Sequence, residues 1–261
     1  MNFSLEGILK ELKSKDFYNI EIIRSTTSTN DVLKSVAKQG ELEGKVLVAL
    51  SQSNGKGRLG RNFFSQETTG LYFSVILRPI LLPKDSILIT TAAATAVAKA
   101  IKEVSGKNAK IKWVNDVFVG SKKVCGILTE AGIKNEKYLD YAVLGIGINA
   151  FYPENGFKNE IKDIAGAVFD NNADGMRNKL LAKILDNFYD YYKNLTKKEY
   201  VKEYISLSCA VGEEVTVISN GVEKDAFCIG IDDECRLIVK YPSGEKGVLS
   251  SGEISIKIKS V

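Results

Sequence analysis

The sequence predicts an α+β protein in which helices flank a mixed β-sheet and a small β-barrel follows. Three observations predict this class. Helical and strand-like hydrophobic patterns alternate along most of the chain. The strand-like segments are rich in β-branched residues. After about residue 207 the helical patterns stop, and short strands separated by turn residues such as Ser243-Gly244 replace them. We therefore expect one domain at 1–206 and a small β domain at 207–261.

The elements follow from local patterns. Leu5, Ile8, Leu9 and Leu12 recur at helical spacing after Ser4, a suitable N-cap residue. Further helices are expected at 28–39, 86–104, 176–192 and 197–206. Strands are expected at 20–23, 45–50, 71–77, 110–113, 124–131 and 138–148, with a loop at 114–123. Four more strands are expected at 215–218, 226–229, 237–240 and 245–249. Strand 138–148 is almost continuously apolar, which predicts a place inside the sheet.

The composition is that of an ordinary globular chain: of 261 residues, 44% are hydrophobic and 26% are charged. The net charge of +4 is too small to require a nucleic acid or an anionic membrane as partner. The absence of histidine excludes Ser–His and Cys–His nucleophile pairs and histidine metal sites. The four cysteines form no Cys-x-x-Cys pair, so we expect neither a zinc site nor a disulfide framework.

The N-terminus lacks the basic and apolar regions of a signal peptide. The longest apolar-looking stretch, 87–100, is too short and too rich in threonine and alanine to span a bilayer. These two features predict a cytoplasmic protein with reduced cysteines.

A loop at 51–65 holds three glycines and three cations within seven residues, from Gly55 to Arg61. Glycine lets the backbone approach a ligand closely and expose its N–H groups. Cations between the glycines suit a carboxylate or a phosphate, because arginine can bind either group in a bidentate manner. The alternative is a flexible, solvated loop. The loop is not a dinucleotide fingerprint, because no helix is expected to follow it, and its spacing misses the P-loop pattern.

Two further segments are ambiguous when taken alone. Ser28-Thr29-Asn30-Asp31 begins a helix, where free N–H groups and small polar side chains could bind a ligand, or where Ser28 and Asp31 form a plain capping box. The glycines in Leu144–Asn149 lie inside a strand, which indicates close approach of either a ligand or another part of the protein.

A third segment, Lys112–Asp116, leads through Gly120 to the apolar strand that Lys123 begins. Trp113 is the only tryptophan and is more often a core residue than a ligand contact, and Asn115-Asp116 could simply be a turn. Lys123 is either a guard against edge-strand aggregation or a positioned cation.

Together these segments resemble biotin protein ligases, and the resemblance runs from about Arg24 to Ser255. The matching motifs, in the family's order, are Ser28-Thr29-Asn30, Gly55-x-Gly57-Arg58-x-Gly60-Arg61, Lys112-Trp113-Val114-Asn115-Asp116, Lys123-x-x-Gly126-Ile127-Leu128 and Gly145-Ile146-Gly147-Ile148-Asn149. Three positions depart from the family pattern, with Lys56 for arginine, Phe63 for tryptophan and Val114 for proline. The resemblance implies a class II synthetase-like catalytic domain and an SH3-like barrel.

The resemblance also implies a two-step reaction. Biotin and ATP would form biotinyl-5′-AMP, with Mg²⁺ carried by the ATP phosphates, and a lysine of a biotin carboxyl carrier protein would then accept the biotinyl group. The implied catalytic residues are Lys123, Arg58 and Asp116. The implied biotin-binding residues are Ser28, Thr29, Asn30, Gln52, Gly55, Lys56, Gly57, Arg58, Lys123 and Gly126. The implied ATP-binding residues are Arg58, Arg61, Phe63, Lys112, Asn115, Lys123 and Asn149. No metal ligands are expected.

Only about 25 residues precede the Ser-Thr-Asn element, which predicts the monofunctional type without a DNA-binding domain, and no DNA or membrane partner. A homodimer through a sheet edge is possible, with strand 138–148 as one candidate. A lipoate or octanoyl ligase is a rival, but the chain lacks both histidine and the Arg-Arg-Gly-Gly-Gly run of those families. A rival from another class is a nucleic-acid-binding module, in which Gly-Lys-Gly-Arg follows phosphates and Phe63-Phe64 stacks on bases.

Overall fold

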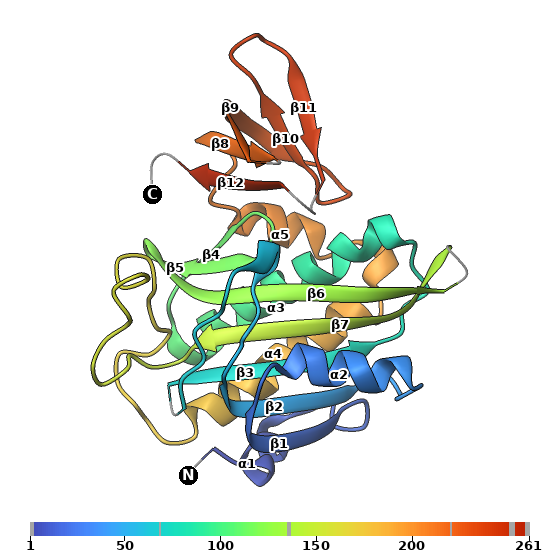
Figure 1. Ribbon diagram of the computed structural model, residues 1–261, viewed down its shortest axis with the longest axis vertical. Helices are drawn as coiled ribbons and strands as arrows, with labels where there is room; N and C mark the ends of the chain where they lie inside the picture. The colour runs from blue at the N-terminus through green and yellow to red at the C-terminus, as the bar shows by residue number, and fades with distance from the viewer. Residues whose placement is uncertain (1–2, 68, 135–136, 220, 251–253, 259–261) are drawn as a thin grey trace.

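The computed structural model describes residues 3–67, 69–134, 137–219, 221–250 and 254–258. A seven-stranded sheet forms its centre, in the order β1-β2-β3-β7-β6-β5-β4 (Figure 1). The strands are β1 Asn19–Thr26, β2 Lys45–Gln52, β3 Gly70–Leu77, β4 Ala109–Lys112, β5 Asp116–Val119, β6 Lys122–Lys134 and β7 Tyr138–Asn149. Strands β1 and β2 pair in parallel and the other neighbours are antiparallel, so the mixed sheet is confirmed.

Two sequence predictions about this sheet need correction. The segment expected to be a loop at 114–123 contains strand β5, which pairs with β4 on one side and with β6 on the other. The apolar strand β7 lies between β3 and β6, inside the sheet as predicted. Because both of its edges are paired there, its suggested part in a homodimer through a sheet edge was wrong.

Helices cover both faces of the sheet (Figure 1). Helix α2 lies on one face, against β2, β3 and β7, while α3 packs against β4, β5 and β6 on the other and α4 packs against α3. The helices are α1 Leu5–Glu11, α2 Thr29–Lys38, α3 Ile87–Ser105, α4 Met176–Tyr192 and α5 Val201–Leu207, with short 3-10 turns at Arg58–Gly60, Pro83–Ser86 and Leu195–Lys197. The predicted N-cap of α1 is present, since the Ser4 hydroxyl accepts a hydrogen bond from the Gly7 amide.

The C-terminal unit is a five-stranded antiparallel sheet in the order β11-β10-β9-β8-β12. Its strands are β8 Glu214–Ser219, β9 Val222–Ile231, β10 Leu237–Lys240, β11 Lys246–Leu249 and β12 Ile254–Ile258. It sits beyond β4, β5 and α5 in Figure 1, and its apolar side chains join the core of the larger unit. The Trp113 indole crosses this junction and donates a 2.9 Å hydrogen bond to the carbonyl of Cys235. Among the described residues, no helix is both long and apolar enough to cross a membrane.

Candidate active site

Two neighbouring cavities lie over the centre of the seven-stranded sheet. The larger has a volume of about 340 Å³ and is bounded by the glycine–cation loop, β4 to β6 and the C-terminal sheet. The smaller, of about 20 Å³, lies at the N-terminus of α2. Lys56, Phe63 and Gly126 line both cavities, so these residues form the partition between them.

The glycine–cation loop folds back on itself as a short hairpin above the sheet. The Phe63 amide donates to the Gly55 carbonyl over 2.7 Å, and the Gly57 amide donates to the Arg61 carbonyl over 2.7 Å. Its tip reverses through Leu59 and Gly60, which both have positive φ angles. The loop thereby places the Phe63 ring over the sheet, between the two cavities.

The glycines inside β6 and β7 make room for the Phe63 ring. Gly126 and Gly147 are register partners, and a Cβ on either would lie 3.2 Å or 2.6 Å, respectively, from a ring carbon of Phe63. The ring also meets Tyr72 edge-on, with 6.3 Å between ring centroids. The close approach that the sequence indicated is therefore made by a side chain of the loop. Stacking of Phe63 on adenine remains a prediction.

The larger cavity is strongly positive. Six cationic side chains contribute to its lining: Lys56, Arg58, Arg61, Lys112, Lys123 and Lys257. Within the described part of the lining, Asp116 is the one carboxylate. Burial lowers the pKa of Arg58 and of Lys112, while nearby Asp116 acts to raise both. A concave surface with this excess of cations favours anionic ligands.

Lys123 and Asp116 form the centre of this charge cluster. The Lys123 ammonium lies 2.7 Å from a carboxylate oxygen of Asp116 on the adjacent strand β5. The backbone of Lys123 is fixed by two hydrogen bonds, from its amide to the Ile164 carbonyl (2.7 Å) and from the Gly166 amide to its carbonyl (2.9 Å). A lysine so held is a positioned cation, which was one of the two alternatives from the sequence.

Asn115 ties the glycine–cation loop to this hairpin. Its Oδ1 accepts a hydrogen bond from Arg58 Nη1 at 3.2 Å, and its Nδ2 donates to the Ile127 carbonyl at 2.8 Å. The preceding Trp113–Val114 peptide bond is cis. The Val114 carbonyl accepts a hydrogen bond from the Tyr204 hydroxyl, so this turn is also held from α5.

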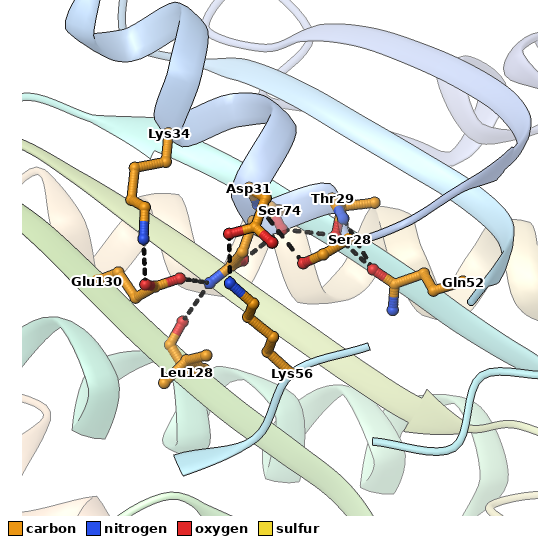
Figure 2. A network of polar contacts seen from close by, with 10 residues as sticks. Ser28, Thr29, Asp31, Lys34, Gln52, Lys56, Ser74, Leu128 and Glu130 are labelled. Carbon is orange, nitrogen blue, oxygen red and sulfur yellow. Dashed lines mark hydrogen bonds and ion pairs between the residues drawn. The ribbon is translucent and has the colours of Figure 1, made fainter. Parts of the chain in front are cut away.

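Around the start of α2, uncharged polar groups line the smaller cavity (Figure 2). Lys56 also reaches it. Ser28 caps the helix by accepting a hydrogen bond from the Asp31 amide, which is one of the two bonds of the expected capping box. The Asp31 carboxylate of the same helix pairs with Lys56. The Thr29 amide donates a 2.8 Å hydrogen bond to Gln52 Oε1. Gln52 Nε2 in turn donates to Ser65 in the loop, over 3.0 Å. The capping residues therefore also line a cavity, so the two interpretations of this segment are compatible.

The structure brings together nearly all the site residues that the sequence indicated. Ser28, Thr29, Asn30 and Gln52 line the smaller cavity, while Asp116, Asn149 and the cations line the larger. Gly55 is the exception, because it lines neither cavity in the described structure. A Cβ there would lie 2.5 Å from the Phe63 carbonyl, so Gly55 allows the loop to close on itself.

Other parts of the site were missed by sequence reasoning. Apolar walls of the larger cavity come from Ile161 and Ile164, and Ile218 and Lys257 add a wall from the C-terminal sheet. These segments carry no motif, and only the fold brings them to the cavity. Ser74 and Glu130 contact Asn30, and Lys34 pairs with Glu130. A small polar residue or a lone glutamate within an apolar strand would have been the signal.

A concave site with this excess of cations, beside a second cavity with hydroxyl and amide groups, is suited to a ligand that carries both anionic and neutral polar groups. A model of the Biotin/lipoate A/B protein ligase family matches residues 22–149. A model of the Biotin protein ligase C terminal domain matches residues 210–257. The chain belongs to the biotin protein ligase family.

Individual relatives agree with this assignment. The chain is 30% identical to the bifunctional ligase/repressor BirA of Bacillus subtilis over 94% of its own length and 75% of that protein. It is 27% identical to the biotin–[acetyl-CoA-carboxylase] ligase of Mycobacterium tuberculosis, covering 90% of this chain and 88% of that one. The structure of the Aquifex aeolicus biotin protein ligase in complex with biotin and ATP is similar, with a TM-score of 0.74, 28% identity and coverage of 92% and 99% of the two chains.

Proposed function

We propose that the two cavities mark the sites of the two substrates of a biotin-activating reaction, with the bicyclic ring of biotin at the polar groups of the smaller cavity and ATP in the larger. The smaller cavity, of about 20 Å³, has room for about one water molecule, so the loop that carries Lys56 and Phe63 must move outward when the ring enters. The observation that supports this is the contrast between the cavities that meet at Phe63. Apart from Lys56, which lines both and pairs with Asp31, one offers neutral hydrogen-bonding groups, and the other offers cations around Lys123. A ureido ring is neutral, whereas a carboxylate and a triphosphate are anionic, so each substrate part meets groups suited to it.

The first step joins two anionic groups. A biotin carboxylate oxygen attacks the α-phosphorus of ATP, the bond from that phosphorus to the bridging oxygen breaks, and pyrophosphate leaves. The two anions repel each other, so the site must neutralise them and hold them in line. Lys123 would bridge the carboxylate and the α-phosphate, while Arg58 and the loop at Lys56 and Gly57 would surround the same groups.

In the second step a lysine amine of a biotin carboxyl carrier protein attacks the carbonyl of biotinyl-5′-AMP. An amide bond forms, AMP leaves and the amine loses a proton. Asp116 is the carboxylate of the larger cavity that could orient or deprotonate this amine. Its contact with Lys123 keeps it within reach of the reacting carbonyl. We therefore assign Asp116 to the transfer step.

The nucleotide would be held at the other end of the larger cavity. Phe63, Lys112, Asn115 and Asn149 would line the nucleotide side, and Arg61 would approach the phosphates. Mg²⁺ would travel with the ATP phosphates and water.

The same assignment gives each of the two domains a role. We propose 1–206 as the catalytic domain and 207–261 as a β domain that closes the nucleotide cavity, since Ile218 and Lys257 line it. A homodimer through an edge of the seven-stranded sheet would use β1 or β4, its two outer strands. Light scattering of the full chain with and without ligands tests this, and equal masses of one chain would contradict it.

Mass spectrometry tests the proposed function. The full chain is incubated with Mg-ATP, biotin and a biotin carboxyl carrier domain, and a parallel reaction contains lipoate in place of biotin. We expect the carrier domain to gain the mass of one biotinyl group, and to gain nothing in the lipoate reaction. Transfer of lipoate alone would contradict the proposal. Binding of duplex or single-stranded nucleic acid at physiological salt, without carrier modification, would favour the nucleic-acid alternative.

A further inference from the structure

A row of polar side chains runs behind the smaller cavity, from Lys34 at its outer end to Thr29 at the cavity (Figure 2). Lys34 pairs with Glu130 Oε1, and Glu130 Oε2 accepts a 3.1 Å hydrogen bond from Asn30 Nδ2. Asn30 Oδ1 lies 2.6 Å from the Ser74 hydroxyl, which lies 2.7 Å from the Thr29 hydroxyl. Asn30, Ser74 and Thr29 are 4%, 0% and 3% exposed, so water cannot substitute for these contacts.

The Glu130 carboxylate determines which way the Asn30 amide points. A carboxylate offers only acceptors, so Asn30 must present its NH₂ group to Glu130. The same Nδ2 atom reaches the Leu128 carbonyl at 3.5 Å, another group that only accepts. The amide oxygen of Asn30 is therefore turned toward Ser74.

This orientation of the Asn30 amide determines where the hydroxyl protons of Ser74 and Thr29 point. Ser74 has one hydroxyl proton, and Asn30 Oδ1 carries none, so Ser74 donates to Asn30. The proton of the Thr29 hydroxyl then has two protein acceptors within reach, the Ser74 oxygen at 2.7 Å and Gln52 Oε1 at 3.1 Å. In either case the proton stays within the protein, and a lone pair of Thr29 Oγ1 is left to accept a hydrogen bond at the cavity.

We propose that Glu130 is a positioning residue. It determines which groups of this pocket donate hydrogen bonds and which accept them, so that the Thr29 hydroxyl accepts a hydrogen bond from a ureido N–H of biotin. This inference rests on the proposed function, because it assumes that the ureido ring occupies the smaller cavity. The ring carries two N–H donors, and a hydroxyl that could rotate freely would recognise them less well than one whose proton is committed elsewhere. Lys34 serves as the counter-ion of Glu130.

Loss of the Glu130 carboxylate would reverse the direction of the hydrogen bonds along this row of side chains. A glutamine at position 130 can adopt two orientations. In one, its amide oxygen faces Asn30 and its NH₂ group faces the Lys34 ammonium. In the other, its NH₂ group faces the NH₂ group of Asn30 and its oxygen faces Lys34. Each arrangement places one donor against another. The Asn30 amide is then free to turn and donate to Ser74. Ser74 would donate to Thr29 instead, and that bond would occupy one of the two lone pairs of Thr29 Oγ1, so that only one is left for biotin.

The first test compares Glu130→Gln with the parent, as full-length chains, by calorimetric titration with biotin in the absence of ATP. We expect the dissociation constant for biotin to rise roughly tenfold to a hundredfold, as for a buried hydrogen bond that loses its partner. The KM for ATP should stay within about twofold of the parent's, since a local effect on the other cavity is not expected. Glu21→Gln, which breaks the 2.6 Å pair with Lys45 on β1 and β2, is the matched control and should leave both values unchanged.

A second variant tests the polarity itself. In Asn30→Asp/Glu130→Gln, the new glutamine can accept from Lys34 and donate to the new carboxylate, which still accepts from Ser74. We expect this double variant to recover most of the biotin affinity that Glu130→Gln loses. A double variant as weak as the single one would overturn the polarity argument, as would unchanged biotin affinity in Glu130→Gln. If the parent chain itself failed to bind biotin, the proposed function would fail instead.

Discussion

Gly126 and Gly147 form a platform under the Phe63 ring, and this glycine platform allows a quantitative prediction. In Gly147→Ala the new Cβ would start 2.6 Å from a ring carbon of Phe63. A carbon–carbon contact needs about 3.5 Å, so the ring must move by about 0.9 Å. The ring cannot move toward the sheet, and Tyr72 packs beside it, so the displacement lifts the glycine–cation loop from its closed position.

A displacement of about 1 Å near reacting groups costs on the order of 10²-fold in rate. We therefore expect Gly147→Ala to slow biotin-dependent pyrophosphate release by about that factor. The overpacking should also destabilise the fold, typically by about 1–3 kcal/mol. Phe63→Leu/Gly147→Ala should recover that stability in thermal unfolding, because the clashing ring is absent.

Two further glycines provide a graded comparison. In Gly126→Ala the Cβ would start 3.2 Å from the ring, so a shift of about 0.3 Å suffices and less than about a tenfold loss is expected. A Cβ at Gly230 in the C-terminal sheet would meet nothing within 4 Å, which makes Gly230→Ala the control. Parental pyrophosphate release by Gly147→Ala, or equal losses in all three variants, would refute the platform argument.

Three other predictions concern the cations. Lys123→Met should slow biotinyl-adenylate formation about 10²–10³-fold, and a parental rate of pyrophosphate release would contradict the bridging role. Burial lowers the pKa of Lys112 below its ordinary 10.5, so its charge destabilises the fold at neutral pH and this cost disappears as the pH rises toward 10.5. Lys112→Met should accordingly raise Tm at pH 7, with a gain that shrinks at higher pH; a gain independent of pH would exclude this cause. Biotin and ATP should protect Arg58 and Arg61 from trypsin, and equal cleavage with and without ligands would argue against ligand-dependent ordering of the loop.

Much of the candidate site was predictable because its motifs are local. Lys112 to Asp116 and the strand that begins at Lys123 are close in sequence, and a hairpin necessarily brings them together. The helix start at Ser28 could be recognised from its N-cap. In both places the residues that carry the chemistry also determine the local backbone, so one pattern predicted both.

The remaining features depend on register and packing between distant strands. Ser74 on β3 and Leu128 on β6 both lie opposite Gly145 on β7, and only this pairing brings Ser74 and Glu130 to Asn30. Strand β5 was missed for a similar reason. Its four residues are too few to show a clear periodicity, and their extended conformation depends on pairing with β4 and β6.

The most direct test of the central claim is a crystal structure of this chain with biotin and a non-hydrolysable ATP analogue. The account predicts the ureido ring in the smaller cavity beside Thr29, the triphosphate among the cations of the larger cavity, and the Lys123 ammonium between the biotin carboxylate and the α-phosphate. Both ligands bound elsewhere, or a biotin carboxylate remote from Lys123, would contradict it.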